Sequence, residues 1–180
     1  GFPSNRVFGS GTVLDSARFR YLLSEHLTVD TESIHAFIIG EHGDSELAVW
    51  SGANVAGIPI HDFCEFRGHY QHSDAMEAIY KRVKDSAYEI IDRKGATYYG
   101  IAMAVGHITE SIIRNKSSIL PVSSLLTGQY GLSDLYLSIP TIVNRNGAEQ
   151  VLEISLSDQE HMALKKSAET LQQVIADLDL

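Results

Sequence analysis

The chain has 180 residues, with 14 lysines and arginines against 23 aspartates and glutamates, so its formal net charge is −9 with histidine neutral. An apolar share of 44% and a charged share of 21% are ordinary for a globular protein and exclude a disordered tail, a collagen-like chain and a disulfide-rich scaffold. The negative charge argues against nucleic-acid binding, which needs a basic face. The single cysteine, Cys64, has no partner for an internal disulfide and favours a reducing compartment.

The length suits one domain with a substantial core, and we expect a single domain over residues 1–180. No apolar run approaches the roughly 20 residues of a membrane-spanning helix, so we expect no membrane contact. The sequence begins without an initiator methionine or a signal peptide, and residues 6–8 already resemble a strand. These features predict a fragment of a longer protein.

Apolar residues recur with a helical period in four segments, at about residues 14–27, 74–94, 97–114 and 157 to the end of the chain. Gly95 supplies a stop after the second of them, and Ser157 with Glu160 gives the last one a capping box. These signals predict four helices.

Residues typical of strands fill the segments between the helices, at residues 34–39, 47–55, 118–126, 136–143 and 150–156. Glycines at 128 and 131 and the turn sequence at 144–147 separate the last three runs, which is typical of an antiparallel meander. Because the strands are grouped beside helices rather than alternating with them, we predict an α+β fold, with an antiparallel sheet packed against long helices.

Residues 9–14, Gly-Ser-Gly-Thr-Val-Leu, have the outline of a dinucleotide-binding loop between a strand and a helix. Leu14, however, stands where a third glycine would allow close packing of the helix on the strand. We interpret the segment as a glycine turn that lets the backbone pass close to a neighbour. No other segment supplies the fingerprint, so we do not expect the chain to bind NAD by itself.

Two groups of residues are candidates for chemistry. Asp15 and Arg18 share a helix face, although in isolation they read as a surface ion pair. His42 lies in the sequence Gly-Glu-His-Gly-Asp-Ser at residues 40–45, after a strand, where catalytic groups often sit. An imidazole exchanges protons near neutral pH and needs a carboxylate on its other nitrogen, which Glu41, Asp44 or Asp15 could supply. A turn histidine without chemistry is the alternative.

Three other histidines give weaker signals. His69 and His72, with acidic neighbours, could indicate a metal site, but no third ligand falls at a standard spacing, so we expect a solvated loop and no metal. His35 lies in an apolar strand and reads first as a core or edge histidine. Arg20 and His35 are nevertheless cationic groups in an acidic chain, as an anion site needs.

Three segments together resemble the L-lactate dehydrogenase family: GSGTVLDSARFR at residues 9–20, GEHGDS at 40–45 and KGATYYGIA at 94–102. The resemblance covers the whole chain and corresponds to the C-terminal, substrate-binding half of that enzyme. It implies the fold of the lactate/malate dehydrogenase C-terminal domain, with the N-terminal Rossmann domain absent. It also implies NAD as the cofactor, bound mainly by the absent half.

The resemblance implies a role for each matching residue. His42 is similar to the catalytic acid/base, and Asp15 to the carboxylate that holds it. Arg18 matches the arginine that grips the substrate carboxylate with a planar fork, and Thr97 matches a threonine lining the substrate pocket.

Further positions match residues around the cofactor and an effector. Ser10 is similar to a serine near the cofactor, and Ile101 to the residue that packs against the nicotinamide. Arg20 and His35 match the positions that bind fructose 1,6-bisphosphate across a subunit interface in allosteric bacterial enzymes.

The resemblance implies pyruvate and L-lactate as substrates, a cytoplasmic homotetramer activated by fructose 1,6-bisphosphate, and an inactive chain in isolation. Two alternatives stay open. One is a lactate-dehydrogenase-like malate dehydrogenase, and the other is a non-catalytic module that binds a sugar bisphosphate or assembles with itself.

Overall fold

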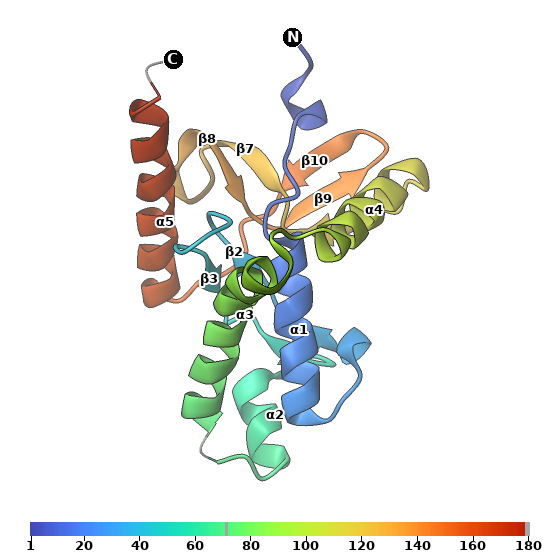
Figure 1. Ribbon diagram of the computed structural model, residues 1–180, viewed down its shortest axis with the longest axis vertical. Coiled ribbons are helices and arrows are strands. Elements are labelled where there is room, and N and C mark those ends of the chain that lie inside the picture. Colours follow the sequence, from blue (N-terminus) through green and yellow to red (C-terminus); the bar gives the residue numbers. More distant parts are fainter. Residues whose placement is uncertain (71, 179–180) are drawn as a thin grey trace.

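A computed structural model of the chain describes residues 1–70 and 72–178 (Figure 1). These residues contain five α-helices: α1 Val13–Leu27, α2 Ile60–Phe66, α3 His72–Lys94, α4 Tyr99–Ile113 and α5 Asp158–Ala176. In Figure 1, α1 runs through the middle of the molecule beside α3, and α5 stands along the strands at one edge. None of the described helices is both long and apolar enough to cross a membrane.

The four predicted helices are confirmed. The predicted second helix ends as expected, because Gly95 takes a left-handed φ of +78° and its N–H donates to the Ile91 carbonyl at 2.7 Å. The predicted last helix begins at the Ser157 capping box and ends at Ala176, whereas residues 179–180 lie outside the described part. Helix α2 was not predicted, because seven residues are too few to show a helical period.

The strands are short and pair antiparallel throughout the described residues: β1 Ile34–His35, β2 Ile38–Ile39, β3 Leu47–Ala48, β4 Asn54–Val55, β5 Ile58–Pro59, β6 Ser118–Leu120, β7 Ser123–Thr127, β8 Ser133–Ser138, β9 Thr141–Asn144 and β10 Gly147–Val151. They form two three-stranded sheets, β1-β4-β5 and β10-β9-β6, and two pairs, β2-β3 and β7-β8. The α+β class with antiparallel strands is therefore confirmed.

The predicted strand lengths are wrong in several places. The runs at 118–126 and 136–143 each divide into two strands at Pro121 and Pro140, because proline has no N–H for the ladder. Residues 6–8 are not a strand: Ser4–Arg6 form a 3-10 turn, and only Gly9 makes a bridge, to Ser123.

Helix α1 joins two of the three apolar clusters that the described residues form. Its last turns, with Phe19, Leu23 and Leu27, pack against α2 and α3, where the Phe19 and Trp50 rings meet edge to face with centroids 4.8 Å apart. Its first residue, Val13, belongs to a cluster with α4, β6 and β9. The third cluster lies between α5 and strands β2, β3, β7 and β8. The first turns of α1 therefore lie where α3, α4 and the strands converge.

Candidate active site

Hydrogen bonds fasten the start of α1 to strand β2. The Thr12 hydroxyl donates to the Ile38 carbonyl at 2.6 Å, and the Ser16 hydroxyl accepts from the Ile38 N–H at 2.9 Å. Both polar side chains are buried, and each has a hydrogen-bond partner. The first turn of α1, which carries Asp15, is thereby fixed relative to the end of β2, which leads to His42.

The loop from Gly40 to Glu46 follows β2 and is held by its own side chains. The Glu41 carboxylate accepts hydrogen bonds from the Ser45 N–H at 3.1 Å and from the Ser45 hydroxyl at 2.6 Å. The Asp44 carboxylate accepts from the Tyr88 hydroxyl of α3 at 2.8 Å. Neither of these carboxylates is paired with His42, although both were candidates on sequence.

His42 pairs with Asp15, whose Oδ2 lies 2.7 Å from His42 Nδ1. The Asp15 side chain is only 4% exposed, whereas the His42 ring is 54% exposed, so one edge of the ring faces the carboxylate and the rest is accessible. Hydrogen bonding to Asp15 raises the pKa of His42 above its ordinary value, against the opposing effect of desolvation. A carboxylate at Nδ1 places the proton there in the neutral ring and leaves Nε2 to exchange protons with a bound molecule.

Arg18 contacts the other oxygen of the same carboxylate, with Nη1 3.2 Å from Asp15 Oδ1. Its side chain is 16% exposed, so the sequence-based alternative of a surface ion pair is wrong. The first turn of α4 packs beside it, since a Cβ built on Gly100 would lie 3.9 Å from Arg18 Nη2. Thr97 is half-buried in the connection that leads into this turn.

The two residues expected near a cofactor lie on either side of the start of α1. Ser10 is half-buried in the glycine turn, where its carbonyl accepts from the Val13 N–H at 3.3 Å. Ile101 lies on α4 and packs against the cluster that contains Val13. The glycine-turn interpretation is confirmed, because a Cβ on Gly11 would come within 2.6 Å of the Pro121 carbonyl and the Ser123 nitrogen.

Sequence reasoning missed Glu46. Its side chain is buried, and one carboxylate oxygen lies in a group with atoms of Asp15 and His42 that are all within 4.8 Å of one another. Burial, with the nearby charge of Asp15, raises the pKa of Glu46 to about 8. The available signal was its place four residues after His42 in the same motif.

These three residues could be mistaken for a metal site. The 2.7 Å separation of His42 and Asp15 is a hydrogen-bonding distance, however, and ligands of one ion with bonds of about 2.0–2.2 Å lie farther apart. The His42 and Asp15 atoms are thus spaced as a pair that shares a proton rather than as two ligands of one ion. The absence of a metal stays a prediction for this chain.

His69 and His72 lie at the entry to α3, away from this group. His72 is the first residue of the helix rather than part of a loop, so the predicted solvated loop is wrong for His72. Its Nε2 lies 2.8 Å from Nδ1 of His61, and its Nδ1 lies 3.0 Å from the His69 carbonyl. A proton on Nδ1 of His72 satisfies both contacts, because its Nε2 then accepts from His61.

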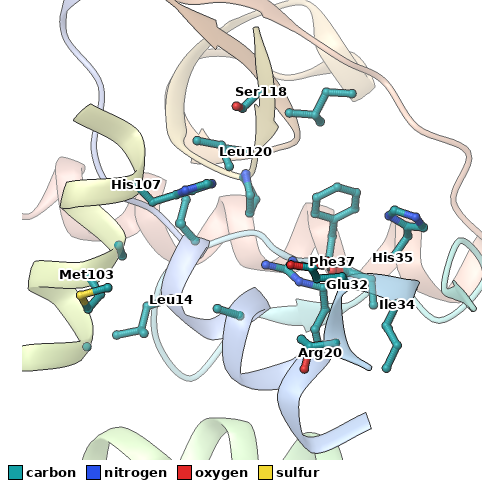
Figure 2. A pocket seen from close by; sticks show the side chains of 18 residues that line it. Leu14, Arg20, Glu32, Ile34, His35, Phe37, Met103, His107, Ser118 and Leu120 are labelled. Atoms are coloured by element: carbon teal, nitrogen blue, oxygen red, sulfur yellow. Dashed lines mark hydrogen bonds between the residues drawn. The ribbon is translucent and has the colours of Figure 1, made fainter. Parts of the chain in front are cut away.

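A cavity of about 720 Å³ lies between α1, α4 and the segment around β1 (Figure 2). Arg20 and His35 both line it, with Met103 and His107 of α4 on the opposite side. Arg20 donates from Nη1 to the Ala36 carbonyl at 3.2 Å, and burial lowers its pKa. His35 is exposed, so it is not a core histidine.

The fold and the site together define an α+β domain that carries a buried aspartate shared by a histidine and an arginine. Residues 12–179 match the family described as the lactate/malate dehydrogenase, alpha/beta C-terminal domain. This chain belongs to that family.

Several known proteins are similar over the full length of the chain. It is 57% identical over 180 residues to an L-lactate dehydrogenase of Acetivibrio thermocellus and 54% identical to one of Thermoanaerobacter sp., covering 57% and 58% of those proteins. The structure matches minor L-lactate dehydrogenase from Enterococcus mundtii in the ligands-bound form, with a TM-score of 0.94 and 42% identity over all of this chain and 57% of that one. The chain therefore spans somewhat more than half the length of its relatives.

Proposed function

We propose that this chain is the substrate-binding half of an NAD-dependent L-lactate dehydrogenase, which interconverts pyruvate and L-lactate. One observation carries the proposal: Asp15 holds His42 at 2.7 Å through one oxygen and contacts Arg18 at 3.2 Å through the other. This places a proton donor and a carboxylate-binding group side by side, which is what reduction of a 2-oxo acid requires.

When bound, NADH would supply the hydride for the reduction of the pyruvate carbonyl carbon. His42 donates the proton from Nε2 to the carbonyl oxygen, on which negative charge develops, so that pyruvate becomes lactate. The Asp15 carboxylate stabilises the imidazolium before the transfer, and this keeps the proton available near neutral pH. In lactate oxidation the same nitrogen accepts the hydroxyl proton.

Arg18 orients the substrate. One Nη atom is held by Asp15, and the guanidinium still offers several donors in a plane to the substrate carboxylate. Thr97 would line the pocket from the connection before α4. Ser10 and Ile101 would contact the nicotinamide end of the cofactor, while its phosphates depend on residues outside this chain.

The test is steady-state NADH oxidation by the protein that carries this chain together with a cofactor-binding domain. The variant His42→Asn lacks a group that titrates near neutral pH, so we expect kcat for pyruvate reduction to fall about a hundredfold or more. Because the pKa of His42 is raised, the wild-type rate should persist above the ordinary histidine range and fall when the imidazolium deprotonates. The matched control, His161→Asn on α5, should retain activity. Full turnover by His42→Asn would contradict the mechanism.

Two comparisons separate this proposal from its alternatives. A preference for oxaloacetate over pyruvate in kcat/KM would favour malate dehydrogenase. Residues 1–180 alone should show no pyruvate-dependent NADH oxidation, and turnover by this piece would contradict the dependence on a cofactor domain.

We also propose that Arg20 and His35 bind the phosphates of fructose 1,6-bisphosphate in a cytoplasmic homotetramer. Both residues line one cavity, and Arg20 has no carboxylate partner among the residues described. The exposed Glu32 also lines the cavity, and its carboxylate opposes a bound anion. Binding therefore needs the combined charge of Arg20 from more than one chain of the tetramer.

A further inference from the structure

We propose that Glu46 is a positioning residue for the His42–Asp15 pair, held as a neutral carboxylic acid while Asp15 carries the charge, and that it ionises at alkaline pH and then retains the proton on His42. The inference rests on the proposed function only in naming His42 as the acid/base. The arrangement of the three side chains is independent of it.

Glu46 is placed by packing rather than by an ion pair. The residue is 5% exposed, and its Oε1 has no hydrogen-bond partner among the described residues. Its backbone carbonyl accepts from the Tyr80 hydroxyl of α3, which fixes the end of the loop against that helix. A buried carboxyl oxygen without a donor favours the protonated form, because a buried carboxylate needs compensation.

The charged groups around Glu46 come from three parts of the fold. Helix α1 supplies Asp15 and Arg18, the loop supplies His42, and α3 supplies Lys84. The two cationic side chains are engaged elsewhere, because Arg18 contacts Asp15 and Lys84 Nζ donates to the Asp44 carbonyl at 2.5 Å. Tyr80 holds its proton, since burial raises its pKa to about 12.

Two carboxylates this close in a buried site do not both ionise readily. Asp15 contacts the cationic groups of His42 and Arg18 directly, whereas Glu46 forms no ion pair among the described residues, so the proton belongs on Glu46. The three side chains of Asp15, His42 and Glu46 then have a net charge of zero when His42 is protonated. Donation of the proton from His42 leaves one buried negative charge instead of two, so the neutral Glu46 makes that donation easier.

At alkaline pH the charge of Glu46 comes to bear on His42. The carboxyl of Glu46, with a pKa of about 8, ionises beside an imidazole whose own pKa Asp15 holds above its ordinary value. The new charge near His42 stabilises the imidazolium further. Glu46 thus extends the pH range over which His42 carries its proton, and the groups titrate as a coupled set.

The first test observes the carboxyl and imidazole groups by NMR in protein labelled with carbon-13 at glutamate and histidine, titrated from about pH 6 to about pH 10. The wild type should show a glutamate carboxyl resonance with a midpoint near 8 that is absent in Glu46→Gln. The His42 midpoint should be lower in Glu46→Gln, by about one pH unit, because glutamine never ionises. Absence of any glutamate resonance with a midpoint near 8 in the wild type would overturn the inference without recourse to a variant.

The second test is the pH profile of kcat/KM for pyruvate in the complete enzyme. Glutamine resembles the neutral acid in shape and charge, so the readout is the position of the alkaline limb rather than the rate near neutral pH. The alkaline limb of Glu46→Gln should move about one unit lower, which corresponds to about a tenfold lower kcat/KM well above the midpoint. A merely structural role would reduce activity at every pH without moving the limb, and that result would also overturn the inference.

The control is Glu89→Gln, which makes the same change at an exposed position on α3 that pairs with Arg93. It should leave the alkaline limb of the pH profile in place.

Failure of the proposed function and failure of the inference about Glu46 can be told apart. If the protein does not reduce pyruvate but the NMR midpoints behave as stated, the proposed function is wrong and the inference about Glu46 stands. If pyruvate is reduced while Glu46 is ionised near neutral pH, only the inference fails.

Discussion

At the scale of single residues, Gly40 determines where His42 lies. Gly40 joins β2 to the loop with a left-handed φ of +95°, and its N–H and carbonyl pair with Ser138 at 2.9 and 3.1 Å. A Cβ built there would lie 2.7 Å from Ser167 Oγ, the hydroxyl that accepts from the Glu41 N–H at 2.8 Å. Any side chain at Gly40 would therefore strain the backbone and disturb the loop that carries His42.

The variant Gly40→Ala should lower the free energy of unfolding by about 1–3 kcal/mol, because alanine must adopt a strained conformation and displace Ser167. Urea denaturation measures this loss, and kcat for pyruvate should fall with it as His42 shifts. The matched control is Gly106→Ala in the interior of α4, where a Cβ meets nothing within 4 Å. Alanine there should stabilise by about 0.5–1 kcal/mol, since it favours the helix. Equal effects of the two substitutions would contradict the role given to Gly40.

At the scale of elements, the N-terminus of α5 ties the helix to the turn between β3 and β4. The Ser157 hydroxyl accepts from the Glu160 N–H at 3.3 Å, and Glu160 in return accepts from the Ser157 N–H at 2.8 Å. Glu160 also accepts from the Ser51 N–H at 2.9 Å. Burial opposes the charge of Glu160, but the hydrogen bonds from both serines outweigh it and lower the pKa of its carboxyl.

Removing the two halves of this cap should have unequal effects. Ser157→Ala deletes one acceptor and should lower the free energy of unfolding by about 1 kcal/mol. Glu160→Ala leaves the Ser51 and Ser157 donors unsatisfied and should lower it by more, about 2 kcal/mol or above. Chemical denaturation at neutral pH would measure both. A larger loss for Ser157→Ala would show that the contact with Ser51 contributes little.

The helices could be predicted from sequence because their signals are local: apolar period, the Gly95 stop and the Ser157 cap. The strands could not be bounded, since two-residue strands such as β1 and β2 exist only through their partners β4 and β3. The candidate site was likewise predictable only where its residues belong to a local motif. The motifs at 9–20 and 40–45 identified His42 and Asp15 as candidates, but the burial of Glu46 depends on where α3 packs, which residue spacing does not encode.

At the scale of the whole molecule, the acidic chain presents a largely apolar cavity that carries the Arg20 guanidinium as well as the Glu32 carboxylate. The cavity that contains Arg20 and His35 is lined mostly by apolar residues of α1, α4 and the segment 118–121. On α4, the side chains of Tyr99, Met103 and Ile113 are strongly exposed. In an assembly of such chains, cationic groups brought together at an interface repel one another, and a bound bisphosphate would offset that repulsion.

The Arg20 and His35 proposal therefore predicts a link between anion binding and assembly. Calorimetry should detect fructose 1,6-bisphosphate binding to the complete protein, weakened by added salt, and sedimentation should show more tetramer when it is bound. The double variant Arg20→Gln/His35→Gln should lose both effects, because glutamine keeps hydrogen bonding but not charge. The control Arg145→Gln, at an exposed position in the β9–β10 turn, should keep both. Equal binding by the double variant and the wild type would remove these residues from the effector site, while leaving the assignment of His42, Asp15 and Arg18 untouched.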